Sequence, residues 1–355
     1  MNNFVVRCDV GNFLRLIAAT ICLPLIVALV LAQTPEADKQ AAKAIMPRRQ
    51  PLVHTYSIVA RDPETGQLGV AVQSNWFSVG GLVTWAEAGV GAVATQSIVD
   101  PSYGALGLQL MKAGKSAPEA LKSLLAGDAQ ADVRQVAMID AEGRVAAHTG
   151  EHCIIAAGHK VGTNHSAQAN LMLKDTVWGA MSKAFESAKG DLADRLMAAL
   201  EAAQGEGGDI RGKQSAAILI VSGKSTGKPW ADKLFDLRVE DSKEPLVELK
   251  RLIKLQRAYN HMNAGDDFFA KNDIAGAIRE YGAAEAIAPD NIEMVFWHAI
   301  TLANGKKVDE ALPLFKRVFA ADRNWATLVE RLPKSNMLPN DPKLIEQILS
   351  VAPKK

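Results

Sequence analysis

Residues 55–72 read TYSIVARDPETGQLGVAV, and this stretch decides the fold because it predicts a β-hairpin. Two runs of β-branched and apolar residues, 55–60 and 68–72, flank the turn sequence DPETG. β-branched residues favour strands, whereas Pro and Gly in so short a segment mark a turn. We therefore expect the first domain to open with two antiparallel strands, and Thr55 to lie at the head of the first one.

The residues that follow mix strand patterns with helix patterns. Apolar and β-branched runs predict further strands at 89–95, 133–139, 144–147, 215–221 and 234–239. Helical spacing of apolar residues predicts helices at 103–113, 117–126, 167–188 and 192–203. Groups of strands that alternate with helix pairs indicate an α+β fold in which helices cover the faces of sheets.

From residue 245 onward the pattern is helical only, and it contains an internal repeat. The first copy consists of Gly265, Phe268, Ala277, Tyr281, Ala284 and Pro289. The second copy, 34 residues further on, consists of Ala299, Leu302, Ala311, Phe315 and Val318. This spacing of small and aromatic residues is typical of tetratricopeptide repeats. It predicts an all-α domain over 245–355, with a capping helix at 246–261 and a partial third unit at 325–349.

The N-terminus resembles an export signal. Arg7 and Arg15 precede an uncharged run at 16–32, and Val30 and Ala32 occupy the small-residue positions of a cleavage site. The alternative is a retained anchor helix, although the run is short for a bilayer and contains Pro24. We expect a signal peptide at 1–32, a flexible spacer at 33–54, a first domain at 55–244, and a mature protein in the periplasm or outside the cell.

Composition and charge narrow the function. Lys and Arg number 40 against 39 Asp and Glu, so the chain lacks the basic excess of a nucleic-acid-binding protein. Signal cleavage would leave Cys153 as the single cysteine, which excludes an intramolecular disulfide. The fold must then be held together by its core.

The segment 207–215, GGDIRGKQS, combines glycines with charged and polar residues just before an apolar strand. Glycines let the backbone approach a ligand closely. Asp209 and Arg211 can orient one another or clamp a polar group of a substrate. The alternative is a tight loop whose Asp–Arg pair holds only its own backbone, and the sequence leaves both open.

Two other patterns carry less weight. The sequence GKST at 223–226 lacks a glycine five residues earlier, where Ile218 stands, so a hairpin turn is favoured over a phosphate-binding loop. Four histidines in the segment 148–165 lack the Cys or carboxylate ligands at set spacings that metal sites use. We expect neither a metal nor a cofactor.

A resemblance to a known family adds to these patterns. The motifs at 55–62, 89–96, 100–104, 147–150 and 207–217, taken in order, resemble the family of unknown function DUF1028. The resemblance extends over about 55–249. That family is similar to the N-terminal-nucleophile hydrolases, so the resemblance implies a four-layer α-β-β-α sandwich, followed here by the helical domain.

The resemblance also implies a mechanism. In N-terminal-nucleophile hydrolases, the first residue of the first strand attacks an amide carbonyl, and its own α-amino group is the base. Thr55 occupies the matching position. An α-amino group has a pKa near ~8, close to neutral pH, whereas that of Lys is near ~10. The mechanism requires a cut between His54 and Thr55, because signal cleavage alone leaves residues 33–54 in place. His54 cannot replace the amine, since successive side chains of a strand point to opposite faces.

Other residues would support Thr55. Asp209 and Arg211 would orient the nucleophile or bind substrate. The candidates for hydrogen bonds to the oxyanion, each worth about 3 kcal/mol in catalysis, are Gln73, Ser74 and Asn75. The second-line candidates are Gln96, His148 and Gln214. The alternative for each of them is ordinary hydrogen bonding in loops and at sheet ends.

These patterns predict an exported amidohydrolase that acts on an amide of a small molecule or a peptide, with a tetratricopeptide-like module at its C-terminus. The alternative is a non-catalytic envelope protein whose helical module binds a protein partner. Because about three repeats are needed for independent stability, the helices should pack on the first domain or on a second copy of the chain. A phosphate-binding protein is disfavoured.

Overall fold

The computed structural model describes residues 52–353, and within them it contains two antiparallel sheets. The larger sheet has the order β11 (Lys233–Val239), β10 (Ser215–Val221), β3 (Leu68–Ser74), β2 (Thr55–Arg61), β9 (His165–Ala169) and β8 (Gly158–Gly162). The smaller sheet has the order β1 (Leu52–Val53), β5 (Gly91–Ile98), β6 (Arg134–Asp140) and β7 (Val145–Thr149), and β4 (Thr84–Glu87) also pairs with β5.

The predicted hairpin at 55–72 is confirmed. Strands β2 and β3 pair antiparallel from Thr55 opposite Ser74 to Arg61 opposite Leu68. The strands predicted at 133–139 and 144–147 pair as β6 and β7, and those predicted at 215–221 and 234–239 pair as β10 and β11. Strands β6 and β10 are buried at every residue, and the apolar runs within them are the reason that both could be predicted from the sequence.

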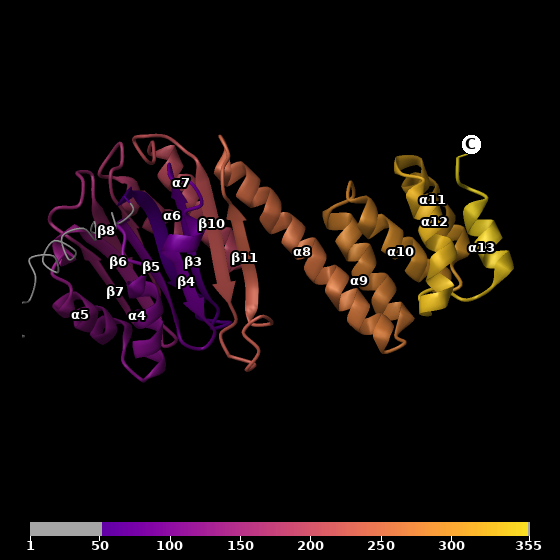
Figure 1. Cartoon of the computed structure of the whole chain (residues 1–355), viewed down its shortest axis with the longest axis horizontal. Coiled ribbons are helices and arrows are strands. Elements are labelled where there is room, and N and C mark those ends of the chain that lie inside the picture. Colours follow the sequence, from indigo (N-terminus) through magenta and orange to yellow (C-terminus); the bar gives the residue numbers. More distant parts are fainter. Residues whose placement is uncertain (1–51, 354–355) are drawn as a thin grey trace, which may run out of the picture. The chain divides into compact units, whose positions relative to one another are not determined.

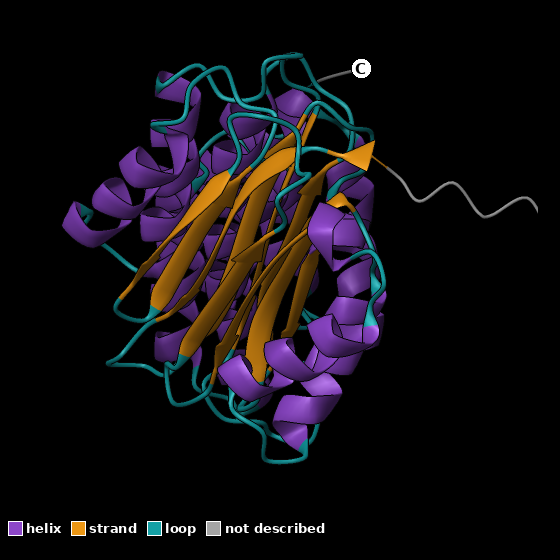
Figure 2. Cartoon of the chain, turned by 90° about the vertical axis from the view of Figure 1, so that its left-hand side faces the viewer, coloured by secondary structure: helices purple, strands orange, loops and turns teal. Residues whose placement is uncertain are grey.

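Helices cover the outer face of each sheet (Figure 2). Helices α4 (Ser102–Lys112) and α5 (Ala117–Gly127) pack on the smaller sheet, and α6 (Val177–Ser187) and α7 (Leu192–Gly205) pack on the larger one. An apolar cluster that includes Val59, Val72, Ala94 and Ala137 fills the space between the sheets. The short α3 (Gly80–Val83) and the 3₁₀ turn η1 (Ala131–Val133) lie in connections.

One helix prediction was wrong over part of its length. The predicted helix at 167–188 begins in the structure only at Val177, and its first residues belong to β9. The alanines of that segment are compatible with a helix, but β9 instead pairs with β2 on one side and β8 on the other. Tertiary pairing here overrides local propensity.

The end of the predicted spacer also differs from the structure. Leu52 and Val53 form β1, which pairs with Ile98 and Ser97 of β5. Val53 is fully buried in the cluster between the sheets. The predicted signal peptide and residues 33–51 of the predicted spacer lie outside the described residues.

The C-terminal region is helical throughout. It consists of α8 (Pro245–Ala270), α9 (Ile274–Ile287), α10 (Ile292–Asn304), α11 (Val308–Ala321), α12 (Asn324–Arg331), the 3₁₀ turn η2 (Leu332–Ser335) and α13 (Pro342–Leu349). The predicted capping helix at 246–261 is the first part of the longer α8. Helix α8 starts beside β11 (Figure 1), and its residues Leu246, Leu249 and Ile253 join the apolar core under the larger sheet. Among residues 52–353, no helix combines the length and the apolar character that a membrane span requires.

Candidate functional site

The chain passes from one sheet to the other at His54. Residues 52–53 pair with β5 of the smaller sheet, whereas Thr55 begins β2 of the larger sheet. His54 belongs to neither strand and is 3% exposed. The peptide bond between His54 and Thr55 is therefore held between two sheets, at the end where β3 also finishes.

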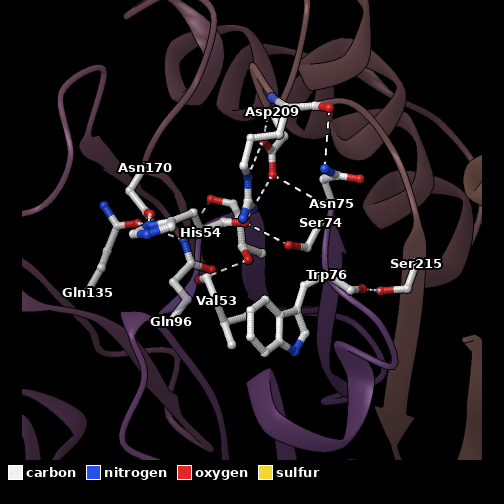
Figure 3. Close-up of polar contacts among 12 residues, drawn as sticks. Val53, His54, Ser74, Asn75, Trp76, Gln96, Gln135, Asn170, Asp209 and Ser215 are labelled. Atoms are coloured by element: carbon white, nitrogen blue, oxygen red, sulfur yellow. Dashed lines mark hydrogen bonds and ion pairs between the residues drawn. The ribbon is translucent and has the colours of Figure 1, made fainter. Parts of the chain in front are cut away.

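Two side chains donate hydrogen bonds to the carbonyl oxygen of His54 (Figure 3). Ser74 Oγ lies 2.6 Å from it, and Arg211 Nη2 lies 2.7 Å from it. The antiparallel register that places Ser74 opposite Thr55 brings the serine to this carbonyl. A neutral hydroxyl and a cation on one carbonyl oxygen form the arrangement that stabilises negative charge developing on oxygen.

Arg211 is held in place by Asp209. The carboxylate accepts hydrogen bonds from Arg211 Nε at 3.0 Å and Nη2 at 2.7 Å, which is the paired geometry that fixes a guanidinium most firmly. The Asp209 side chain is fully buried, and it also accepts from the backbone N–H of Asn75 at 3.1 Å. Gly207 and Gly208 have φ values of 110° and 62°, which a residue with a Cβ adopts only with strain. The glycines therefore allow the turn that presents this pair.

Thr55 is fully buried. Its hydroxyl donates to the carbonyl oxygen of Val53 at 3.0 Å. Its own carbonyl oxygen accepts from Gln96 Nε2 at 3.1 Å and from the backbone N–H of Asn170 at 3.1 Å. One donor comes from β5 of the smaller sheet and the other directly follows β9 of the larger sheet, so both sheets fix the Thr55 backbone.

The imidazole of His54 enters a buried polar network between the sheets. Its Nδ1 lies 2.7 Å from Asn170 Oδ1, and Asn170 Nδ2 donates to Gln135 Oε1 at 2.9 Å. Gln96 Nε2 donates to the same Gln135 oxygen at 2.6 Å. Burial lowers the pKa of His54 from its ordinary value, against the hydrogen bond to Asn170, and the nearby Arg211 lowers it further.

The structure brings together six of the residues that the sequence singled out. They are Thr55, Ser74, Asn75, Gln96, Asp209 and Arg211. The pair Asp209–Arg211, for which the sequence left two interpretations open, holds its own loop and also reaches across to the His54 carbonyl. Asn75 contributes mainly through its backbone N–H, and its side chain donates to the Arg211 carbonyl oxygen at 3.2 Å.

Three other predicted residues lie apart from this carbonyl. The side chain of Gln73 lies on the face of β3 opposite to that of Ser74. Neither polar atom of its buried amide has a hydrogen-bond partner within residues 52–353. His148 on β7 contacts the carbonyl oxygen of Ala131 at 2.7 Å. The side chain of Gln214 donates to Asp241 at 3.1 Å, although its backbone N–H bonds to the Ser74 carbonyl oxygen.

Sequence analysis did not predict that the His54 side chain is buried in a polar network. It also did not identify the other two members of that network, Asn170 and Gln135. Asn170 follows β9, in the segment for which a helix was predicted. It lies 116 residues from His54 along the chain, so no local pattern connects the two. The only sequence signal is the alternation of polar and alanine residues in 166–170, SAQAN, which suits a strand with a polar inner face.

The loop at 223–226 is a connection between β10 and β11, as the hairpin interpretation predicted. The next element is β11 rather than a helix, and Asp232 accepts from the hydroxyls of Ser225 and Thr226 and from the backbone N–H of Thr226. These three donors are therefore already bonded to a carboxylate of the same chain.

Comparisons with known proteins agree with the motifs. The model of the family of unknown function DUF1028 matches residues 55–249. The crystal structure of protein SPO2555 from Silicibacter pomeroyi, which is assigned to DUF1028, is similar with a TM-score of 0.51 and 30% sequence identity. The match covers 57% of this chain and 88% of that one. A comparison with curated proteins finds no match. Since the family model covers more than half of the chain, including every residue of the site except Val53 and His54, the chain belongs to DUF1028.

Proposed function

We propose that the chain is an N-terminal-nucleophile hydrolase that first cuts its own peptide bond between His54 and Thr55 and then cleaves an amide bond of a small molecule or a peptide. The observation that carries the proposal is the pair of donors on the His54 carbonyl oxygen, Ser74 Oγ at 2.6 Å and Arg211 Nη2 at 2.7 Å. An ordinary loop carbonyl does not require an arginine, held by a buried carboxylate, to be aimed at it. A carbonyl that is to be attacked does.

The self-cleavage balances without a cofactor. The Thr55 hydroxyl oxygen adds to the carbonyl carbon of His54, and Ser74 and Arg211 stabilise the oxyanion. The C–N bond then breaks, the hydroxyl proton passes to the nitrogen, and an ester joins His54 to the Thr55 side chain. Water hydrolyses this ester, which leaves a carboxylic acid on His54 and a free amine and hydroxyl on Thr55.

The mature site would retain the parts that the self-cleavage uses. The new α-amino group of Thr55 would be the base, with a pKa near ~8 that suits neutral pH. Ser74 and Arg211 would bind the carbonyl oxygen of the substrate, and Asp209 would hold the guanidinium in place. Asn75 would fix Asp209, and Gln96 would fix the Thr55 backbone.

Intact-mass measurement of the purified full chain tests this function. The wild type should yield a chain that begins at Thr55, and so should Thr55→Ser, which keeps the hydroxyl. The near-isosteric Thr55→Val should remain uncut because it has no nucleophile. The mature wild type should also gain mass from a β-lactone that acylates N-terminal threonines. A chain that keeps residue 54 and does not react with the lactone would contradict the proposal and favour a non-catalytic envelope protein.

The layers of the fold support the same class. Two facing antiparallel sheets, each covered on its outer face by a helix pair, correspond to the α-β-β-α sandwich of N-terminal-nucleophile hydrolases. The nucleophile position at the start of β2, next to the end of β3, also fits that class. We assign this sandwich to residues 55–244.

We further propose that residues 245–355 form a tetratricopeptide-like module. Gly265 of α8 packs against the ring of Tyr281 on α9, and a Cβ at residue 265 would lie 3.0 Å from that ring. The equivalent residues of the second copy, Ala299 and Phe315, are both fully buried. These contacts suit helices that approach closely at small residues. Such a module binds a protein partner or a second copy of the chain, and it would do so whether or not the first domain is an enzyme.

Export completes the proposal. The charged start, the apolar run at 16–32 and the small residues at 30 and 32 support signal cleavage. An epitope tag after Lys355 and fractionation of cells should place the shortened chain in the periplasm or the medium. A full-length chain in the cytoplasm would reject export.

A further inference from the structure

The imidazole of His54 occupies a buried site whose far end is a hydrogen-bond acceptor. Its Nδ1 lies 2.7 Å from Asn170 Oδ1, and His54 is 3% exposed. Because an amide oxygen only accepts, Nδ1 must carry the proton. Nε2 then bears the lone pair, and it has no hydrogen-bond partner within residues 52–353.

The orientation of the Asn170 amide is fixed by its neighbours. Gln135 Nε2 lies 2.9 Å from the Ala169 carbonyl oxygen and 3.2 Å from the Gly158 carbonyl oxygen, which only accept. Gln135 must therefore turn its Oε1 toward Asn170, whose Nδ2 donates to it at 2.9 Å. This leaves Oδ1 as the atom that Asn170 presents to His54. A rotation of the Asn170 amide would turn its oxygen toward the Gln135 oxygen and break the hydrogen bond between these two amides.

We propose that the space filled by the His54 side chain is the acyl-group pocket of the mature enzyme, and that it selects amides whose acyl part carries a neutral N–H donor, namely an imidazole or a carboxamide. The inference rests on the proposed function. The nucleophile and the two donors to the carbonyl oxygen are the same for the chain's own bond and for a substrate. A substrate carbonyl bound there places its substituent where the His54 side chain now lies.

The charges around the pocket narrow the substrate class. A carboxylate would turn an acceptor toward Asn170 Oδ1, so no hydrogen bond would form. A cation would be desolvated close to Arg211. The lowered pKa of His54, caused first by burial and also by Arg211, is a consequence of the same surroundings. An aliphatic acyl group would fit but would leave the Asn170 oxygen unpaired, at a loss of about 10-fold or more in kcat/KM.

The chain's own cleavage gives the first test. Residue 54 is removed with the segment before it, which we call the leader (the residues that precede Thr55), so every variant at 54 yields the same mature protein. Asparagine and leucine side chains have the same branched arrangement of four heavy atoms, but only asparagine donates N–H. We expect the full chain with His54→Asn to cut itself at a rate close to that of the wild type. His54→Leu should cut itself about 10-fold more slowly, as followed by intact mass.

The second test uses substrates supplied to the mature wild type. N-acetyl-histidyl, -asparaginyl, -leucyl and -aspartyl amides of 7-amino-4-methylcoumarin release a fluorophore on cleavage. The histidyl and asparaginyl amides should have kcat/KM values about 10-fold or more above that of the leucyl amide, and the aspartyl amide should be the poorest.

The possible outcomes distinguish failure of the proposed acyl-group pocket from failure of the proposed hydrolase function. The pocket proposal is overturned if the chain cuts at Thr55 but cleaves the leucyl amide as fast as the histidyl and asparaginyl amides, and if His54→Leu cuts itself as fast as the wild type. The hydrolase proposal would survive that result. A chain that neither cuts itself nor reacts with the β-lactone overturns the proposed function and the pocket with it.

Discussion

At the scale of single residues, the site is defined by one carbonyl oxygen and the groups that donate to it. Ser74 is positioned by strand register and Arg211 by its ion pair with the buried Asp209 carboxylate. Neither donor lies near His54 in the sequence, since they are 20 and 157 residues away. The chemistry therefore depends on contacts that only the folded chain creates.

Ser74→Ala should slow the self-cleavage without unfolding the domain. Removal of one oxyanion donor costs roughly 10²–10³ in rate, so the chain that begins at Thr55 should accumulate that much more slowly. The rate is measured by intact mass over time. Ser166→Ala on β9 is the matched control, because it removes another fully buried serine hydroxyl that bonds to Gln168 rather than to the carbonyl. Equal rates for the two variants would exclude Ser74 from the oxyanion site.

Gln73→Met should stabilise the protein and leave the self-cleavage rate unchanged. Both polar atoms of this fully buried amide lack hydrogen-bond partners in the part of the chain that the structure describes. Leaving a buried polar group unpaired costs about 1–3 kcal/mol, and a methionine of similar shape avoids that cost. The free energy of unfolding in urea should rise by about 1 kcal/mol. A marked loss of stability would mean that the amide has a bonding role.

The sequence identified most of the polar residues around the carbonyl, but not the groups that surround the imidazole. Asp209 and Arg211 stood out because charges and glycines rarely precede a buried strand. His54, Asn170 and Gln135 come from three distant segments, and their burial follows from a polar network between the sheets. A burial pattern read from hydrophobic periodicity cannot find a core that is polar.

At the scale of elements, uninterrupted apolar strands were predictable and short mixed strands were not. The run SAAILIV of β10 is buried at every residue and was assigned over the observed bounds. Strand β8, GHKVG, is largely exposed and contains no apolar run, so only its pairing with β9 makes it a strand. In the helical region, the 34-residue repeat identified the contacts between helices, but not the continuity of α8 through residues 245–270.

Tyr281→Ala should destabilise the C-terminal helices. The Tyr281 side chain is 3% exposed and fills the space beside Gly265, so its removal leaves a cavity that costs about 3–5 kcal/mol. Thermal unfolding followed by circular dichroism should show a lower melting temperature for the helical signal. Tyr281→Phe is the control, since it keeps the ring and loses only the hydroxyl. An unchanged melting temperature for Tyr281→Ala would refute the repeat assignment.

At the scale of the whole molecule, apolar contacts cross the domain boundary that we place at residue 244. Leu246, Leu249 and Ile253 lie on α8 but pack with β11 and α7 of the first domain. Arg257 adds ion pairs to Asp191 and Asp194 near the start of α7. The first turns of α8 therefore contribute to the stability of the sandwich.

A chain that ends at residue 244 should be less stable than one that ends at residue 257. The longer chain keeps three apolar side chains that are 8% exposed or less, and each contributes about 1.5–3 kcal/mol when buried. The urea midpoint of the shorter chain should be lower, and it should bind more of a dye for exposed apolar surface. Equal midpoints would show that the sandwich ends at the predicted boundary.

The crossing of the chain at His54 has a consequence for biosynthesis. The carbonyl is polarised only after β3 and the 209–211 loop have both reached it, and the loop is 157 residues further along the chain. The proposed cleavage would then occur only after the domain has folded, because an unfolded or incompletely synthesised chain does not bring Ser74 and Arg211 to the His54 carbonyl. In a pulse-chase experiment, the shortened chain should appear only after protease resistance has developed, and chains trapped in aggregates should still carry the leader.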